Sequence, residues 1–175
     1  MAKENPPRLL IDEATIAGRI DEMAQQIVAD LGSSFVMVVV LKGAYVFAAD
    51  LLRALGRHGS QPRVEFLGVS SYGSERTTSG TVVPWTPIPK VDGKSVLIIE
   101  DVLDSGLTVT HARDVLAKAG AAAQHVCALL DKPERRQVPL AADYVGFTVG
   151  DQFVVGYGID WAERYRELSY IAVVE

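Results

Sequence analysis

The chain has 175 residues, of which 49% are hydrophobic and 22% charged, and its formal net charge at pH 7 is -5. This length and composition are typical of one globular domain with a substantial core, so a second full domain is not expected. The acidic balance gives no electrostatic footprint for nucleic acid, although a local basic patch is compatible with that total. We therefore expect no nucleic-acid partner.

Three features of the sequence predict a cytoplasmic protein with no membrane partner. Residues 1–8 are polar and lack the apolar core of a signal peptide. No apolar run approaches the length of a membrane-spanning helix. Cys127 is the only cysteine, so an intramolecular disulfide is impossible and a reducing compartment is expected.

The N-terminal third of the chain predicts a helix and then a buried strand. Apolar side chains recur at steps of four and three over residues 16–31, which is typical of an amphipathic helix. Asp12 is placed to cap its start and Gly32 to end it. Residues 35–41 form a short, valine-rich run bounded by turn residues, which predicts a central strand.

Lys42 and Gly43 follow that strand directly, and apolar residues at helical spacing continue over 45–55. A lysine beside a glycine at a strand end can simply turn the chain. Its cation and the nearby backbone N–H groups can equally bind a phosphate. The residues alone do not decide between these interpretations.

A long loop is expected after the next strand, which is predicted over residues 64–69. Residues 70–89 contain glycines, serines and prolines without periodicity. Loops of this length are functional covers or disordered segments, and the plainer interpretation is a surface excursion. Trp85 lies in this loop and would pack on the core or on a neighbouring subunit.

The stretch 96–108 combines three chemical features. Its first four residues are apolar and mostly β-branched, which predicts a buried strand of a parallel sheet that ends at Ile99. Glu100 and Asp101 come where that strand should end. Residues 104–108, Asp-Ser-Gly-Leu-Thr, then precede a helix expected over 109–119, with Gly120 as its stop.

This order of strand, acidic pair, polar loop and helix start suits a phosphate group, because helix N–H groups and two hydroxyls surround one point. Glu100 and Asp101 would repel a bare phosphate. They would tolerate a ligand that turns neutral hydroxyls or a divalent cation toward them, so the stretch predicts a ribose phosphate with magnesium. The alternative is an ordinary strand-to-helix connection capped by Ser105 or Thr108.

Further strands are expected over residues 123–130, 144–149, 153–157 and 171–174, with a turn at 150–151 between the second and the third. Lys132 lies just beyond the first of them. Parallel α/β sheets bind ligands at the carboxyl ends of their strands. We therefore expect Lys42, the acidic stretch and Lys132 to share one edge of the sheet.

The stretch 96–108 resembles the motif with which type I phosphoribosyltransferases hold phosphoribosyl pyrophosphate. Residues 41–44 are similar to the pyrophosphate loop of purine phosphoribosyltransferases, which tends to carry a cis peptide at the position of Leu41–Lys42. Residues 143–147 and 153–160 resemble the purine-binding end of hypoxanthine-guanine phosphoribosyltransferases, especially bacterial ones. The resemblance covers the chain from about residue 35 to the C-terminus.

The resemblance implies a single α/β domain over residues 1–175, with a central, mainly parallel sheet flanked by helices. Its core would span about 33–150, a small hood about 1–15 and 151–175, and a flexible loop about 70–89. The implied reaction, in purine salvage, is magnesium-dependent transfer of 5-phosphoribosyl from phosphoribosyl pyrophosphate to hypoxanthine or guanine. Its products are IMP or GMP and pyrophosphate, and the implied assembly is a homodimer or homotetramer.

The resemblance also implies a role for each matching residue. Asp104 would take a proton from the purine as general base. Lys132 would donate to the exocyclic oxygen, Phe153 would stack on the ring, and the backbone of Val154 would contact its far edge. The sugar phosphate would bind to Ser105, Gly106, Leu107 and Thr108, and the pyrophosphate to Lys42, Gly43 and Arg166. Glu100 and Asp101 would bind the ribose diol and its magnesium shell, and Asp160 would bind a magnesium on the pyrophosphate side. Ser71 and Tyr72 would cover the site.

Other interpretations stay open at this point. Phe153 and Val154 can be ordinary buried strand residues, and Asp160 can cap a helix over 161–166. Some proteins of this fold are RNA-binding regulators of nucleotide synthesis, for which a basic surface and a pyrimidine-adapted pocket are expected. A transferase for xanthine or adenine would differ only in the pocket, and xanthine shares the oxygen that Lys132 would contact.

Overall fold

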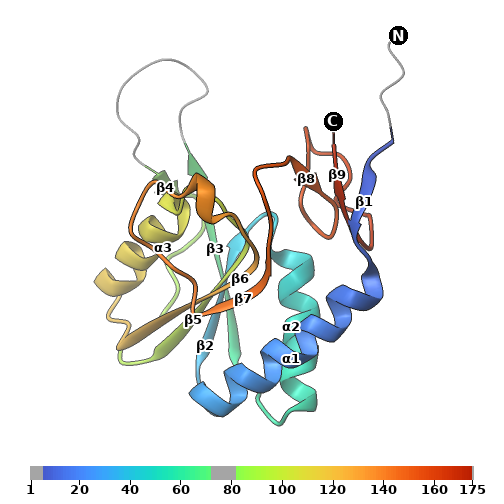
Figure 1. Cartoon of the computed structure of the whole chain (residues 1–175). Coiled ribbons are helices and arrows are strands. Elements are labelled where there is room, and N and C mark those ends of the chain that lie inside the picture. The colour runs from blue at the N-terminus through green and yellow to red at the C-terminus, as the bar shows by residue number, and fades with distance from the viewer. Residues whose placement is uncertain (1–5, 72–81, 175) are drawn as a thin grey trace.

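The computed structural model describes residues 6–71 and 82–174, which form two β-sheets and three α-helices (Figure 1). The larger sheet has six strands in the order β4-β3-β2-β5-β6-β7. Five of them run parallel, and β4 pairs antiparallel with β3. The strands of this sheet are β2 (Val36–Leu41), β3 (Arg63–Ser71), β4 (Val82–Pro84), β5 (Ser95–Leu103), β6 (Ala123–Asp131) and β7 (Tyr144–Thr148).

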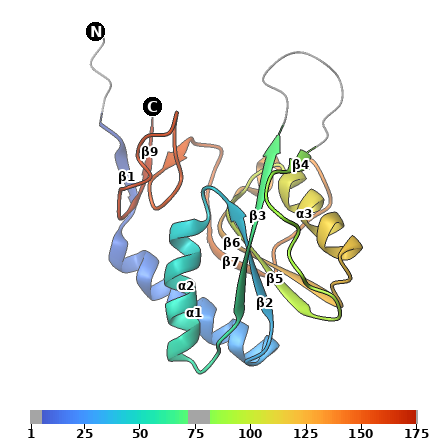
Figure 2. The same ribbon diagram turned by 180° about the vertical axis from the view of Figure 1, so that it is seen from behind.

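Helices cover both faces of this sheet, as the two opposite views show (Figures 1 and 2). Met37 and Val39 of β2 pack into the cluster that includes the apolar faces of α1 (Glu13–Leu31) and α2 (Tyr45–Arg57). Val36, Val38 and Val40 face the other way, toward α3 (Leu107–Lys118). Because successive side chains of a strand point to opposite faces, one valine-rich strand supplies both halves of the core.

The caps predicted for α1 are confirmed. The Asp12 carboxylate accepts a hydrogen bond of 2.8 Å from the N–H of Thr15, which satisfies one of the free donors at the helix start. Gly32 ends the helix with a φ of 71°, and its N–H bonds to the carbonyl of Val28.

A second, smaller sheet joins the two ends of the described chain. Its strands are β1 (Arg8–Ile11), β9 (Ile171–Val173) and β8 (Val154–Val155), in that order and all antiparallel. Figure 2 shows it standing apart from the larger sheet, beside the start of α1. The predicted fold class, an α/β sheet with a hood built from both ends of the chain, is confirmed, whereas the exact bounds of core, hood and loop stay predictions.

Three details differ from the sequence-based expectations. The strand that was expected to end at Ile99 continues to Leu103, because β6 pairs with it as far as Asp131. Residues 82–84 form a strand within the segment expected to be loop. The stretches around β7 and β8 do not pair with each other across residues 150–151, because each belongs to a different sheet.

None of the helices in the described residues combines the length and the apolar character that crossing a bilayer requires. Cys127 lies in the core, and burial raises the pKa of its thiol. Trp85 packs against the backbone of Gly68 in β3, yet 55% of it remains exposed.

Shortening Ile99 should destabilise the fold, because this residue is fully buried between Val39 of β2 and Cys127 of β6. We expect Ile99→Ala to lower the free energy of unfolding by about 2–5 kcal/mol and Ile99→Val by about 0.5–1.5 kcal/mol. Ile88→Ala, at a position that is 54% exposed, should change it by less than about 0.5 kcal/mol. Urea unfolding measures all three, and a similar loss for the two alanine variants would contradict this description of the core.

Candidate functional site

The carboxyl ends of three neighbouring parallel strands meet at one edge of the larger sheet. Lys42 follows β2, Asp104 follows β5 and Lys132 follows β6, and these strands are adjacent in the order β2-β5-β6. The expectation that these residues share an edge is therefore confirmed. The backbone N–H of Lys132 also bonds to the carbonyl of Leu103 at 3.0 Å, which ties the two strand ends together.

A pocket of about 240 Å³ lies at this edge, where the larger sheet meets the small one. Four predicted contacts for the purine, and the predicted magnesium ligand Asp160, line it. Its full lining is Val102, Asp104, Lys132, Arg135, Asp151, Gln152, Phe153, Val154, Ile159 and Asp160.

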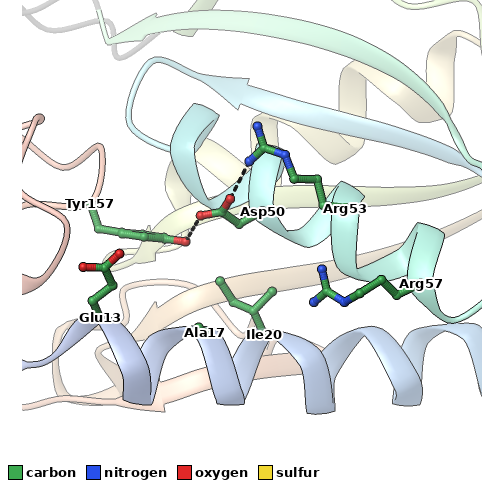
Figure 3. A pocket seen from close by; sticks show the side chains of 7 residues that line it. All are labelled: Glu13, Ala17, Ile20, Asp50, Arg53, Arg57 and Tyr157. Atoms are coloured by element: carbon green, nitrogen blue, oxygen red, sulfur yellow. Dashed lines mark hydrogen bonds and ion pairs between the residues drawn. The ribbon is translucent and has the colours of Figure 1, made fainter.

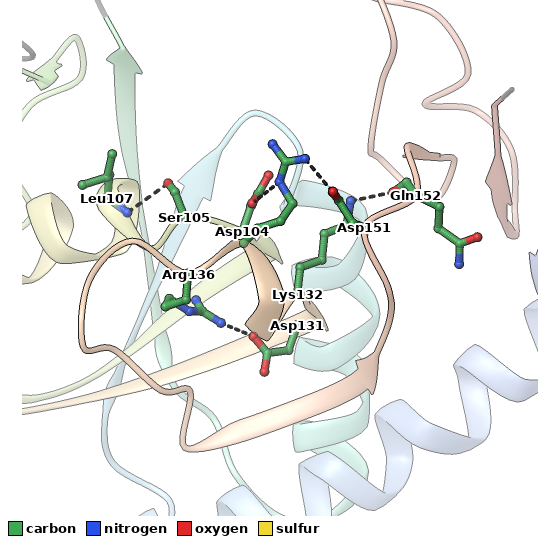
Figure 4. Close-up of polar contacts among 9 residues, drawn as sticks. Asp104, Ser105, Leu107, Asp131, Lys132, Arg136, Asp151 and Gln152 are labelled. Carbon is green, nitrogen blue, oxygen red and sulfur yellow. Dashed lines mark hydrogen bonds and ion pairs between the residues drawn. The ribbon is translucent and has the colours of Figure 1, made fainter.

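Lys132 is almost fully buried, with 7% of the residue exposed. Its ammonium donates a hydrogen bond of 2.7 Å to the carbonyl of Gln152 (Figure 4). Burial lowers the pKa of Lys132, and the nearby carboxylate of Asp104 acts in the opposite direction. The ammonium is thus held in place within the pocket, with donor hydrogens left for a ligand.

Asp104 forms an ion pair that sequence reasoning missed. The guanidinium of Arg135 donates to the Asp104 carboxylate at 2.8 Å and to that of Asp151 at 2.6 Å, and this pairing lowers the pKa of Asp151. Arg135 reaches both because the short helix η1 (Pro133–Arg135) turns the chain back directly after Lys132. The sequence does contain a signal for this contact: a proline suited to begin a helical turn follows Lys132, and an arginine comes three residues beyond that lysine.

The loop before α3 has the geometry of a phosphate cradle. Gly106 has a φ of 84° and precedes the first residue of the helix, Leu107, whose N–H donates to the hydroxyl of Ser105 at 3.3 Å (Figure 4). A side chain at position 106 would meet Val138 and Arg136. Gly106 is the N-cap residue and has no side chain that could cap the helix, so the first-turn N–H groups beyond that of Leu107 stay available to an anion.

The acidic pair lies within β5 and is partly buried. Glu100 is 7% exposed, and its Oε2 has no hydrogen-bond partner among the described residues. Burial raises the pKa of Glu100, and the neighbouring charge of Asp101 adds to that effect. The Asp101 carboxylate lies against the backbone of Gly43, where a Cβ atom would overlap it. The loop after β2 and Asp101 of β5 are therefore in direct contact.

The two cations predicted for pyrophosphate carry acidic partners. Lys42, joined to Leu41 by a cis peptide bond, pairs with Glu163 at 3.0 Å. Arg166 pairs with Asp160 at 2.7 Å and with Glu163 at 3.2 Å. Residues 161–166 form turns instead of a helix, so the interpretation of Asp160 as a helix cap is wrong.

Phe153 lies just before β8 and is 53% exposed, so its interpretation as a buried strand residue is wrong. Its ring meets that of Trp161 edge-on, with the ring centroids 6.4 Å apart. Val154, in contrast, is buried within β8. Of the two residues predicted to cover the site, Ser71 ends β3 and Tyr72 lies outside the described residues.

A second pocket, of about 280 Å³, lies between α1 and α2 and contains none of the predicted site residues (Figure 3). The hydroxyl of Tyr157 donates to Asp50, which also pairs with Arg53 at 2.6 Å. This network ties the chain after β8 to α2 and so supports the position of the small sheet.

The carboxylates at the sheet edge suit magnesium bound together with a substrate. In residues 6–71 and 82–174, no group of three or more metal-ligating side chains forms a closed site. Magnesium is commonly held by one or two carboxylates, with substrate oxygens and water completing its shell. Glu100, with its unpartnered oxygen, and Asp101 and Asp160 fit that arrangement.

The comparisons with known proteins agree with this geometry. The family model described as "Phosphoribosyl transferase domain" matches residues 11–162, and the chain belongs to this family. It is 42% identical to the hypoxanthine phosphoribosyltransferase of Escherichia coli (strain K12), over 95% of this chain and 94% of that protein. It is also 38% identical to the hypoxanthine-guanine phosphoribosyltransferase of Bacillus subtilis (strain 168), over 100% of this chain and 97% of the relative.

A solved structure gives the same result. The crystal structure of a hypoxanthine-guanine phosphoribosyltransferase from Bacillus anthracis is 41% identical in sequence and superposes with a TM-score of 0.88. The match covers 98% of this chain and 99% of that one. The family resemblance of the sequence motifs is thereby confirmed.

The contact between Gly43 and Asp101 should make a side chain at position 43 harmful. Gly43→Ala should displace the Asp101 carboxylate, because its Cβ would overlap it, and phosphoribosyl transfer should fall by about tenfold or more, on the order of 1.4 kcal/mol. Gly18→Ala is the control, since open space surrounds Gly18 within α1. Steady-state kinetics of both variants test this, and equal activities would show that the contact is unimportant.

Proposed function

We propose that the protein is a purine-salvage enzyme that transfers 5-phosphoribosyl from phosphoribosyl pyrophosphate to hypoxanthine or guanine. The products are IMP or GMP and pyrophosphate, and the reaction depends on magnesium. The observation that carries this proposal is the pocket that joins Asp104, Lys132 and the exposed ring of Phe153 beside the phosphate-cradle loop. The names and near-complete coverage of the relatives support the same substrates.

Asp104 is proposed as the general base. The incoming purine is a weak nucleophile while it is neutral, and removal of its imidazole proton as the bond to ribose forms makes it a stronger one. Asp104 faces the pocket from the end of β5, and Arg135 holds its carboxylate in a charged pair. Arg135 therefore orients the Asp104 carboxylate, and the purine must approach alongside this pair.

The base is proposed to bind between Lys132 and Phe153. The buried ammonium of Lys132 would donate to the exocyclic oxygen of the purine, which adenine lacks. Phe153 offers an exposed ring face for stacking, and the backbone of Val154 lies at its side. Xanthine has the same oxygen and is a second candidate substrate.

The phosphates are proposed to bind at both ends of the ribose. The start of α3 would take the sugar phosphate on Ser105, Gly106, Leu107 and Thr108. Lys42, the N–H of Gly43 and Arg166 would neutralise the departing pyrophosphate. Ser71 and Tyr72 are proposed to cover the reacting centre.

Magnesium, held by Glu100, Asp101 or Asp160 together with oxygens of the substrate, would bind the hydroxyls of the ribose diol and neutralise charge on the pyrophosphate. The acids of β5 would also accept hydrogen bonds from the two ribose hydroxyls. The buried, unpartnered oxygen of Glu100 supports this assignment.

Two further properties belong to the proposal. The single, buried Cys127 and the absence of other cysteines favour a reducing cytoplasm. A homodimer or homotetramer is proposed from the family. One solved relative, from Trypanosoma cruzi, was studied for the effect of its C-terminal region on oligomeric state, and this chain is 36% identical to it with a TM-score of 0.90.

The first test is nucleotide formation by the purified protein with magnesium, phosphoribosyl pyrophosphate and one of five bases: hypoxanthine, guanine, xanthine, adenine or uracil. Rapid formation of IMP or GMP, with little product from adenine or uracil, is the expected result. No product from any base, in a protein that still binds phosphoribosyl pyrophosphate, would favour the RNA-binding regulator.

Replacing the proposed base should slow the chemical step and spare binding. Asp104→Asn should lower kcat by about 10²–10⁴-fold, because the amide cannot accept the purine proton, while the Kd for phosphoribosyl pyrophosphate stays within about twofold. Asp114→Asn makes the same charge change at an exposed position of α3 and should behave as the parent. An unchanged kcat for Asp104→Asn, measured in single turnovers, would remove Asp104 from this role.

Loss of the Lys132 ammonium should weaken the use of 6-oxopurines. Lys132→Ala should lower kcat/KM for hypoxanthine and guanine by about 10–150-fold, the value of one hydrogen bond from a charged donor. The small rate with adenine should change much less, because adenine accepts no bond from this lysine. Lys118→Ala, at the exposed end of α3, is the control. An equal loss with every base would instead indicate a structural lysine.

A further inference from the structure

Glu163 lies between the two cations to which pyrophosphate binding is assigned. One of its carboxylate oxygens is 3.0 Å from the ammonium of Lys42, and the other is 3.2 Å from the guanidinium of Arg166. Lys42 belongs to the loop after β2, and Glu163 belongs to the segment between β8 and β9. A single carboxylate therefore joins the larger sheet to the hood through the residues that would hold the leaving group.

The backbone presents this carboxylate in a defined place. The N–H of Glu163 donates to the Asp160 carboxylate at 2.8 Å, and Trp161 and Arg164 exchange two backbone hydrogen bonds of 3.1 Å around it. Ala162 and Glu163 have positive φ angles of 52° and 61°, a conformation that residues other than glycine rarely adopt. A tight turn, closed by its own hydrogen bonds, thus aims Glu163 at Lys42.

A stronger anion can displace Glu163 from its ion pairs with Lys42 and Arg166. The Glu163 and Lys42 side chains are 67% and 61% exposed, and exposed ion pairs contribute little to stability. The cations nevertheless lower the pKa of Glu163, Lys42 more than Arg166, so the carboxylate is charged at neutral pH. Pyrophosphate carries more negative charge and more acceptor oxygens than one carboxylate, and it can replace Glu163 at both cations.

We propose that Glu163 is a positioning residue that takes the place of pyrophosphate between Lys42 and Arg166 while the site is free, and that it competes with pyrophosphate for them. The inference rests on the proposed function, since it takes pyrophosphate as the ligand of both cations. Glu163 keeps the two like charges oriented toward the site and limits the affinity for the leaving product. Return of the carboxylate to Lys42 and Arg166 then assists the departure of pyrophosphate.

Glu163→Gln tests this competition, because the amide keeps the size of the side chain and removes its charge. We expect the inhibition constant of inorganic pyrophosphate and the KM of phosphoribosyl pyrophosphate to fall by about 3–10-fold, that is about 0.7–1.4 kcal/mol. The kcat should not rise, and the inhibition constant of IMP should stay within about twofold. Inhibition kinetics at saturating magnesium, together with calorimetric titration of pyrophosphate, give these values.

Two further variants make the result specific. Glu167→Gln changes the same charge on the same segment, at an exposed residue that forms no ion pair with the described part of the chain. It should leave all constants at the parent values. Glu163→Asp keeps the charge on a shorter side chain, and its inhibition constant for pyrophosphate should lie between those of the parent and Glu163→Gln.

An unchanged or higher inhibition constant for pyrophosphate in Glu163→Gln would overturn the inference, and so would an equal shift in Glu167→Gln. Should Glu163→Gln fail to fold, Glu163→Asp alone decides: a lower inhibition constant for pyrophosphate than in the parent supports the inference, and an unchanged one overturns it. A parent protein that makes no nucleotide and binds no pyrophosphate would overturn the proposed function itself. An active parent whose constants match those of both Glu163 variants would overturn the competition alone.

Discussion

The pairing of β5 between β2 and β6 is the constraint on which the site depends. Parallel pairing aligns the carboxyl ends of these three strands. The residues that follow β2, β5 and β6 directly, which are Lys42, Asp104 and Lys132, therefore lie at one edge of the sheet. The hydrophobic core fixes this pairing, because alternate side chains of the strands are buried against helices on opposite faces. A slip of one residue would expose the core and separate the charged groups at the same time.

Close backbone contacts let the charged groups approach one another. Gly43 leaves room for the Asp101 carboxylate, and Gly158 lies against the carbonyl of Gly43, so the loop after β2 contacts both β5 and the hood. Larger residues at either position would push these segments apart. Two charged side chains also join segments of the site: Arg135 pairs with two carboxylates, and Glu163 pairs with two cations. Ion pairs therefore link the segments that form the site.

Much of the fold and of the loop before α3 could be predicted from the sequence, because these features depend on local interactions. The start and end of α1, the valine-rich β2 and the loop before α3 depend on neighbours within a few residues, and sequence spacing reports such neighbours directly. The missed features depend on distant partners. Strand β5 extends past Glu100 because β6 continues beside it, and Arg135 enters the site because a short helix turns it toward Asp104 and Asp151.

The sequence by itself determined the class of fold, the family and the residue types of the site, because hydrophobic periodicity and a motif of thirteen residues are written in consecutive positions. Only the tertiary structure decided which groups meet. The exposure of Phe153, the burial of Glu100 and the pairing of Lys42 with Glu163, 121 residues away, all depend on how distant segments of the chain pack together. Contacts between segments so far apart arise from packing of the whole chain, and no local pattern encodes them.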